Sequence, residues 1–151
     1  MEIVQIPHNL LAKKCTPLSA EDLKSGVYDE LVADMKKSMK DHDGIGLAAN
    51  QVGKDLALFV IEAQLAKDND IPDTFANPEV TDYGKEKDSI EEGCLSITGF
   101  WTPIQRSKKI MFKALDGKGS KVKFKARGLL ARVLQHETDH LNGLTIKDRA
   151  K

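Results

Sequence analysis

The sequence predicts an α+β domain, with mixed or antiparallel strands packed around a C-terminal helix that carries a metal-binding HExxH pattern. Two observations lead to this fold class. Helical apolar periodicity marks one amphipathic helix near the N-terminus and another helix near the C-terminus. The strand patterns gather between these two helices instead of alternating with them, which favours α+β over a doubly wound parallel sheet.

The N-terminal helix is predicted to begin after Ser19, which stands three residues before Asp22 in a near capping box. Apolar residues then recur every fourth position, which is typical of one helix face; they are Leu23, Val27, Leu31, Met35 and Met39. We expect this helix to end at residues 41–43, before Gly44. The preceding 19 residues contain two prolines and predict irregular structure.

Two strands and a loop are expected in the middle of the chain. Residues 56–61 are all apolar, which predicts a buried strand. Residues 66–74 are polar and contain a proline, so we interpret them as a surface loop. A short strand is expected over residues 75–80, and the charged residues 82–88 predict a turn.

The last third of the chain predicts a hairpin followed by a helix. Residues 109–115 and 120–126 flank an Asp-Gly-Lys-Gly turn, and lysines alternate with apolar residues in the second strand. This alternation predicts one solvated and one buried face. The C-terminal helix is expected over residues 127–141, ending at Asn142-Gly143.

Composition excludes several classes of protein. The 151 residues are 40% apolar and 30% charged, which excludes a disordered chain, and a net charge of zero argues against a globally basic nucleic-acid binder. No apolar run reaches the roughly 18 residues of a membrane span, and no secretory signal is visible. Two cysteines form no disulfide framework. We therefore expect a reducing, cytoplasmic setting.

The segment His136-Glu137-Thr138-Asp139-His140 is an HExxH pattern on a predicted helix. Histidines four residues apart lie about 40° apart around the helix axis, so both imidazoles can reach one metal ion. Glu137 lies about 100° from His136, which suits a base that takes a proton from water beside the metal. The pattern therefore predicts a hydrolytic metal site.

The third metal ligand must come from upstream, because the chain offers little downstream of His140. The position of a third histidine in metzincin-type proteases is occupied by Ile146, and Asp148 is the one carboxylate beyond it. His8 and His42 are candidates. Cys94 is the stronger one, because a thiolate is a good ligand.

Three segments in order resemble the signature motifs of the peptide deformylases. They are Gly44–Gln51 (GIGLAANQ), Glu92–Ser96 (EGCLS) and Gln135–Gly143 (QHETDHLNG). The opening residues 3–7 and Arg106 are also similar to that family. The resemblance covers nearly the whole chain. It implies one catalytic domain over residues 1–151, here without the long C-terminal helix of many bacterial members.

The resemblance implies a hydrolase that removes the N-formyl group from the initiator methionine of nascent peptides and releases formate. Cys94, His136 and His140 would hold one Fe(II) per chain, which Zn, Ni or Co can replace, with a fourth position open to water. Glu137 would be the base. The Gln51 amide and the Leu95 backbone N–H would donate to the formyl oxygen as it becomes negative.

Substrate contacts are expected on both sides of this centre. The peptide is expected to lie extended along Ile45 and Gly46, with Gly44 and Gly93 as further substrate-binding positions. One face of the C-terminal helix should line the pocket for the methionine side chain; its residues are Leu129, Arg132 and Val133. Because a buried unpaired guanidinium is costly, we expect the Arg132 charge at the pocket mouth, in solvent or on a carboxylate.

Two other function classes share part of this pattern. A metallopeptidase would use the same HExxH with a different third ligand, and a structural metal site would need four protein ligands. Nascent formyl-methionyl peptides are the expected partners of a monomeric protein, with no membrane and no specific nucleic acid. The segment 102–127 holds nine Lys or Arg and one acid, Asp116. It is either an ordinary solvated face or a weak contact with ribosomal RNA. The origin implied is bacterial, phage-encoded in a bacterial host, or organellar.

Overall fold

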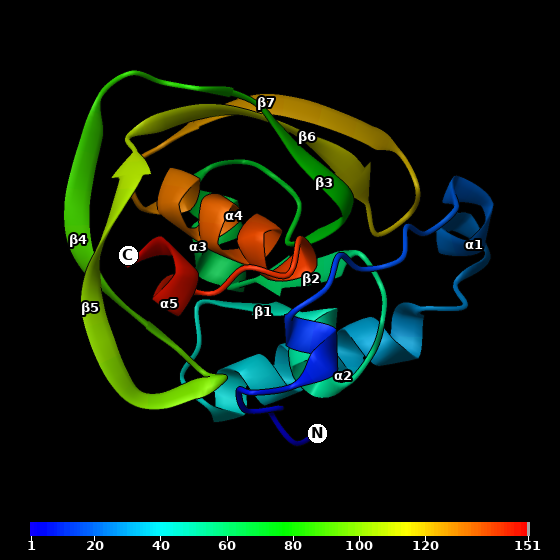
Figure 1. Cartoon of the computed structure of the whole chain (residues 1–151). Helices are drawn as coiled ribbons and strands as arrows, with labels where there is room; N and C mark the ends of the chain where they lie inside the picture. The colour runs from blue at the N-terminus through cyan, green and yellow to red at the C-terminus, as the bar shows by residue number, and fades with distance from the viewer. Residues whose placement is uncertain (151) are drawn as a thin grey trace.

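Helix α4 (Gly128–Leu141) lies at the centre of the molecule, and strands of two antiparallel sheets curve around it (Figure 1). These features come from a computed structural model that describes residues 1–150. Most of α4 is buried, including Leu130, Leu134 and Leu141. The predicted fold class is confirmed, because a single helix is enclosed by antiparallel strands.

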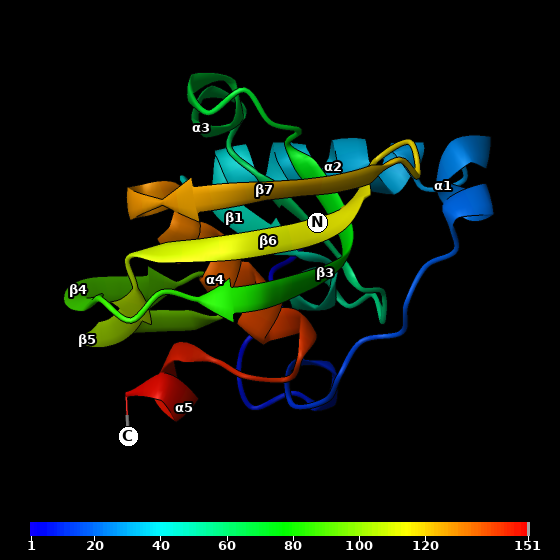
Figure 2. The same cartoon turned by 90° about the horizontal axis from the view of Figure 1, so that it is seen from above.

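The larger sheet has five strands in the order β1-β2-β3-β6-β7, and neighbouring strands are antiparallel throughout (Figure 2). Its strands are β1 (Gly46–Ala48), β2 (Leu58–Ile61), β3 (Thr74–Tyr83), β6 (Lys109–Asp116) and β7 (Lys121–Arg127). Phenylalanines on β2, β3 and β6 pack together in the core, with the rings of Phe75 and Phe112 5.3 Å apart and nearly perpendicular. The predicted 109–126 hairpin is confirmed as β6 and β7.

The smaller sheet is a hairpin of β4 (Lys87–Cys94) and β5 (Ile97–Ser107), which the sequence did not predict as strands. Half of the β4 residues are exposed and only Glu92 is fully buried, so its sequence lacks the alternating apolar pattern of a half-buried strand. The register pairs Gly93 with Trp101 and shifts before Cys94, the last residue of β4. The hairpin lies to the left of α4 in Figure 1, and Cys94 at its turn contacts His140 of that helix.

The single N-terminal helix predicted from the apolar repeat is wrong. Ser19 does cap a helix, but that helix, α1 (Ala20–Ser25), ends at Gly26, and α2 (Asp29–Asp41) starts three residues later. Gly26 adopts a positive φ of 83°, a conformation that terminates helices and that glycine adopts without strain. Val27, counted in the repeat, falls in the break and is exposed.

The other elements are short. The loop predicted over residues 66–74 overlaps the end of a helix, α3 (Ala63–Asp68). Leu65 and Ala66 of this helix are buried against the core despite their polar neighbours. The remaining elements are the 3₁₀ helices η1 (Asn9–Leu11) and η2 (Ala49–Val52) and the helix α5 (Ile146–Arg149). No helix of the described chain is long and apolar enough to cross a membrane.

Candidate active site

Three potential metal ligands converge where β4 meets α4. His136 and His140 face one another with their Nε2 atoms 3.2 Å apart, as the four-residue spacing predicts. Cys94 Sγ lies 3.2 Å from His140 Nε2. The three donor atoms all lie within 4.8 Å of one another. Of the upstream candidates, Cys94 is therefore the one that joins the histidines.

The chemistry of this donor set fits a divalent transition metal. Without a metal ion between them, one thiol and two imidazoles would direct their polar atoms at each other inside the protein. Burial and the nearby charge of His136 lower the pKa of His140 well below its usual value. His140 is thus held as the neutral imidazole, which is the form that ligates a metal.

Glu92 orients His136 from behind. Its Oε1 accepts a hydrogen bond from His136 Nδ1 at 2.9 Å, which leaves Nε2 directed at the other two ligands. Burial opposes ionisation of Glu92, but hydrogen bonds from His136 and Arg106 outweigh it and lower its pKa to about 2. Glu92 is therefore a permanent carboxylate partner for His136.

A buried network of ion pairs holds Glu92 in turn. Arg106 donates from Nε and Nη2 to both Glu92 oxygens, at 2.7 and 3.0 Å, and from Nη1 to Asp139 at 3.0 Å. Asp139 also accepts two hydrogen bonds from Arg149 of α5. The network thus connects α4, both strands of the small sheet and helix α5.

Sequence reasoning missed Glu92 and Asp139 as functional positions. A signal existed on the helix, because Arg132, His136 and Asp139 are spaced i, i+4 and i+7 and so share one face. Charged residues on the face that carries a metal ligand indicate a supporting network.

The expected place of the Arg132 charge, at the mouth of the pocket, is wrong. Arg132 is 7% exposed, and its guanidinium points inward to Glu92 Oε2 and the Ile104 carbonyl. Its Nη2 donates to the Asp88 side chain at 2.8 Å. The requirement for a carboxylate partner is met by buried Glu92 and by Asp88, whose side chain is 39% exposed.

Glu137 faces the cavity beside the ligands and is poised to exchange a proton. It is 4% exposed, and its Oε1 has no hydrogen-bond partner within the described chain. Burial raises its pKa to about 7, although the charges of His136 and Arg106 act against this. A base with a pKa near neutrality is well matched to proton transfer. A Cβ on Gly46 would lie 2.7 Å from Glu137 Oε2, so a side chain there would displace the Glu137 carboxylate.

Gln51 lies on the other side of Cys94, buried in η2. The Ala48 N–H donates to its Oε1 at 3.0 Å, which fixes the orientation of the amide. Its Nε2 consequently donates to Ser96 Oγ at 3.1 Å and faces Cys94 Sγ at 3.6 Å. The amide N–H groups, and not the carbonyl, are thus directed at the metal-ligand cluster.

A cavity of about 950 Å³ opens above this cluster. Its lining includes Cys94, His136 and Glu137, while Gln51 and His140 are not part of it and lie beneath. Leu95, the predicted backbone donor, also lines it. The predicted substrate-binding residues all line it; they are Gly44, Ile45, Gly46, Gly93, Leu129, Arg132 and Val133. Residues as far apart in sequence as Gly44 and Val133, which are 89 positions apart, therefore line one site.

Known proteins share the sequence motifs and the fold. A family model described as Polypeptide deformylase matches residues 1–151. A peptide deformylase of Dictyoglomus turgidum is 43% identical over 150 residues, covering 99% of this chain and 92% of the relative. The crystal structure of peptide deformylase from Thermotoga maritima has a TM-score of 0.88 and 34% identity over 99% of this chain and 97% of that one. The enzyme of Vibrio parahaemolyticus bacteriophage VP16T, crystallised with actinonin, has a TM-score of 0.84 and 30% identity over 96% and 99% of the two chains.

Proposed function

The chain belongs to the polypeptide deformylase family, metal-dependent hydrolases that remove the N-formyl group from nascent peptides, and we propose that its reaction takes place at the cluster of Cys94, His136 and His140. The observation that carries this proposal is the convergence of three donor atoms at the floor of the cavity, beside a carboxylate with a pKa of about 7. The protein binds formyl-methionyl peptides and acts as a peptide deformylase.

The metal proposed for this site is one Fe(II) per chain, replaceable by Zn, Ni or Co. Two imidazoles and one thiolate suit all four ions, and the preference for iron comes from the family resemblance. Cys94, His136 and His140 would hold the ion, which supplies Lewis acidity at the formyl carbonyl when bound. His136 would keep its orientation through Glu92.

The residues of the chain divide the remaining chemistry between them. Glu137 takes a proton from the attacking water as the water oxygen bonds to the formyl carbon. The Gln51 amide and the Leu95 backbone N–H donate to the carbonyl oxygen as it gains negative charge. The carbon–nitrogen bond then breaks, and Glu137 passes the proton to the departing amine. The products are formate and a peptide with a free N-terminus.

The peptide is proposed to lie extended along Ile45 and Gly46. Ile45 precedes β1 and Gly46 is its first residue. Because β1 is an edge strand paired on one side with β2, its other edge can take an added strand. Gly44 and Gly93 keep the approach open because they lack side chains. The methionine side chain would occupy the part of the cavity lined by Leu129, Val133 and the stem of Arg132.

An anaerobic formate-release assay with Fe(II) or Ni(II) tests this function. The expected result is formate from formyl-Met-Ala-Ser and no cleavage of unblocked Met-Ala-Ser. Cleavage of the unblocked peptide would indicate a metallopeptidase instead. Metal analysis should find about one ion per chain, lost in Cys94→Ala and His140→Ala. Bound metal without any formate release would favour a structural site.

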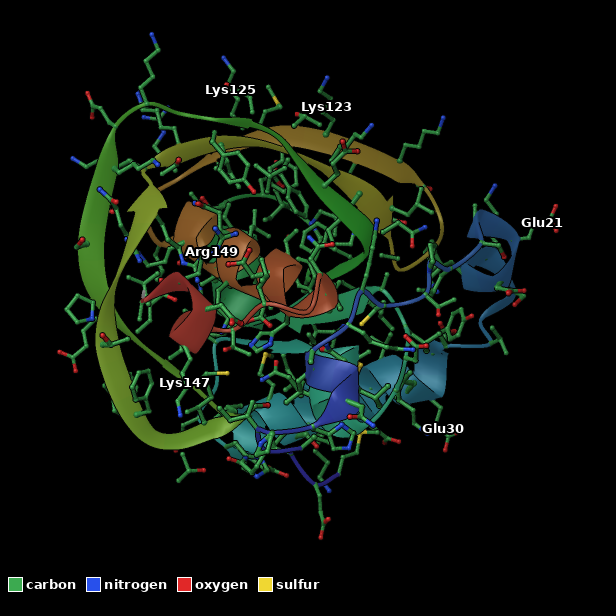
Figure 3. All side chains as sticks on the ribbon, in the orientation of Figure 1. Glu21, Glu30, Lys123, Lys125, Lys147 and Arg149 are labelled. Atoms are coloured by element: carbon green, nitrogen blue, oxygen red, sulfur yellow. The ribbon has the colours of Figure 1, made fainter. Side chains whose placement is uncertain are left out.

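We further propose a cytoplasmic monomer that contacts the ribosome weakly through β6 and β7. Lys123 and Lys125 point outward from β7 (Figure 3), and both are exposed. Co-sedimentation with ribosomes should weaken as salt rises, because phosphate contacts are electrostatic. Salt-independent co-sedimentation would exclude this contact. Sedimentation equilibrium tests the monomer.

A further inference from the structure

Asn50 is a fully buried polar residue of η2 that the chemistry described so far does not use. It stands next to Gln51, and its side chain is 0% exposed. Its Nδ2 donates to the backbone carbonyl of His140 at 2.7 Å and to that of Leu10 at 3.1 Å. Both amide protons are therefore engaged, and they connect η2 to α4 and to η1.

The amide of Asn50 is present for its donor group and not to fill space. Its Oδ1 is buried and has no hydrogen-bond partner within the described chain. Burying an unpaired acceptor is costly, and an apolar side chain of the same size would avoid that cost. The two carbonyls fix which end of the amide is the nitrogen, because only the nitrogen can donate to them.

The bond from Asn50 to His140 has a particular place in the site. Among residues 1–150 it is the one hydrogen bond that joins η2 directly to α4. The ring of His136 is held by Glu92, whereas His140 Nδ1 is buried without a partner in the same residues. The protein therefore holds one histidine through its ring and the other through its backbone carbonyl.

Gln51 depends on this link for its distance from the histidines. The Ala48 N–H donates to its Oε1 at 3.0 Å, and the Val4 N–H donates to its backbone carbonyl at 2.7 Å. These two contacts fix the orientation of Gln51, but neither of them reaches α4. The neighbouring Asn50 is the residue that ties this turn of chain to the helix of the metal ligands.

We propose that Asn50 is a positioning residue that fixes the amide of Gln51 relative to the metal ligand His140. This inference rests on the proposed function, in which the Gln51 amide donates to the formyl oxygen. A donor stabilises the developing negative charge only when it is already in place, so a small displacement of η2 costs rate more than binding.

The first test is Asn50→Leu, which has a similar size but no donor. The His140 carbonyl keeps a second donor, the Gly143 N–H at 3.1 Å, so the substitution leaves this group paired. With formyl-Met-Ala-Ser, kcat should fall by about 10- to 100-fold, with a smaller change in KM and an unchanged metal content. Asn50→Ala should behave in the same way, and it replaces Asn50→Leu if that variant does not fold. An unchanged kcat in the folded variant would overturn the proposal.

Asn77→Ala is the matched control. The Asn77 side chain also bonds backbone groups, accepting from the Leu18 N–H at 2.9 Å and donating to the Leu18 carbonyl at 2.7 Å. It does not line the cavity. This variant should lose stability but keep wild-type kcat at a temperature where it is folded. An equal fall of kcat in both variants would assign the effect to general destabilisation and reject positioning.

A double-mutant cycle separates positioning of Gln51 from a merely structural role. If Asn50 acts through the Gln51 amide, Asn50→Leu should lower kcat by less than about threefold when Gln51→Ala is already present. A structural effect would be the same in both backgrounds. A full 10- to 100-fold further loss in the double variant would therefore overturn the proposal.

Hydrogen exchange of the metal-free protein gives a readout without turnover. The amides of Gly53 and Lys54 donate to the Asn50 and Ala49 carbonyls and so report on η2. They should exchange roughly fivefold faster in Asn50→Leu, the effect of losing one ordinary hydrogen bond, and at the wild-type rate in Asn77→Ala. Unchanged exchange in Asn50→Leu would overturn the link. Formate release by wild-type protein tests the proposed function separately, so an active wild type with an indifferent Asn50→Leu variant would reject this inference alone.

Discussion

The floor of the cavity and the outer face of the five-stranded sheet use the same kind of ion pair in opposite surroundings. Beneath the site, Arg106 Nε lies 2.7 Å from Glu92 Oε2, and their side chains are 4% and 8% exposed. On the outer sheet, Lys113 Nζ lies 3.2 Å from Glu79 Oε2, and both side chains are more than half exposed.

Burial makes these two regions different in function. Solvated pairs such as Lys113–Glu79 are screened and contribute about 0–1 kcal/mol to stability. Buried charges are costly to separate, so the Glu92 network has one favourable arrangement and transmits its rigidity to His136. We therefore expect substitutions at the floor of the cavity to have large effects on formate release or metal binding, and substitutions on the outer sheet to have small effects.

Glu137→Gln should give the largest effect. The variant keeps all three metal ligands but loses the base, so kcat for formate release should fall by about 10²–10⁴-fold at unchanged metal content. The pH dependence assigned to Glu137, whose pKa is raised to about 7, should also disappear. Near-native kcat with the wild-type pH profile would show that another group is the base.

Gln51→Ala should reduce kcat by roughly 10²–10³-fold, with a smaller change in KM, because its hydrogen bond strengthens as the formyl oxygen becomes negative. Ser96→Ala is the matched control. It removes the hydroxyl that Gln51 Nε2 contacts but retains the amide donor. A pure KM effect in Gln51→Ala would limit Gln51 to binding the ground state.

Glu92→Gln should weaken metal binding by about 10–100-fold, as expected when the carboxylate partner of a ligating histidine is lost. Competition with a chelator measures this change. Glu91→Gln, at the adjacent exposed position, should bind metal like wild type. Equal metal affinity in wild type, Glu92→Gln and Glu91→Gln would show that the buried network does not support the metal site.

Lys113→Ala should have the smallest effect. Its free energy of unfolding in urea should stay within about 0.5 kcal/mol of wild type, since its ion pair is exposed. Formate release should be unchanged because β6 presents this residue away from the cavity lining. A loss of unfolding free energy above about 2 kcal/mol would contradict the expected difference between exposed ion pairs on the sheet and buried ones at the floor.

The helix that holds both metal-ligating histidines was predicted mainly from local sequence patterns. The four-residue spacing of His136 and His140 places them on one face of any α-helix, because that geometry depends only on the backbone. The β6–β7 hairpin was predictable for the same reason, from alternation and a turn sequence. The chemistry of thiolate ligands favoured Cys94 as the third ligand, and the family resemblance added Gln51; the structure brings Cys94 to His140 and Gln51 to Cys94.

The tertiary structure alone decided what surrounds these residues. The sequence of β4 is mostly polar and predicts no strand, because its one deeply buried side chain, Glu92, is satisfied by partners 14 to 44 residues away. The inward turn of Arg132 has the same origin, since Glu92 and Asp88 come to it from another strand. Periodicity reports which face of an element is buried, whereas the pairing of buried charges depends on which distant segments meet there.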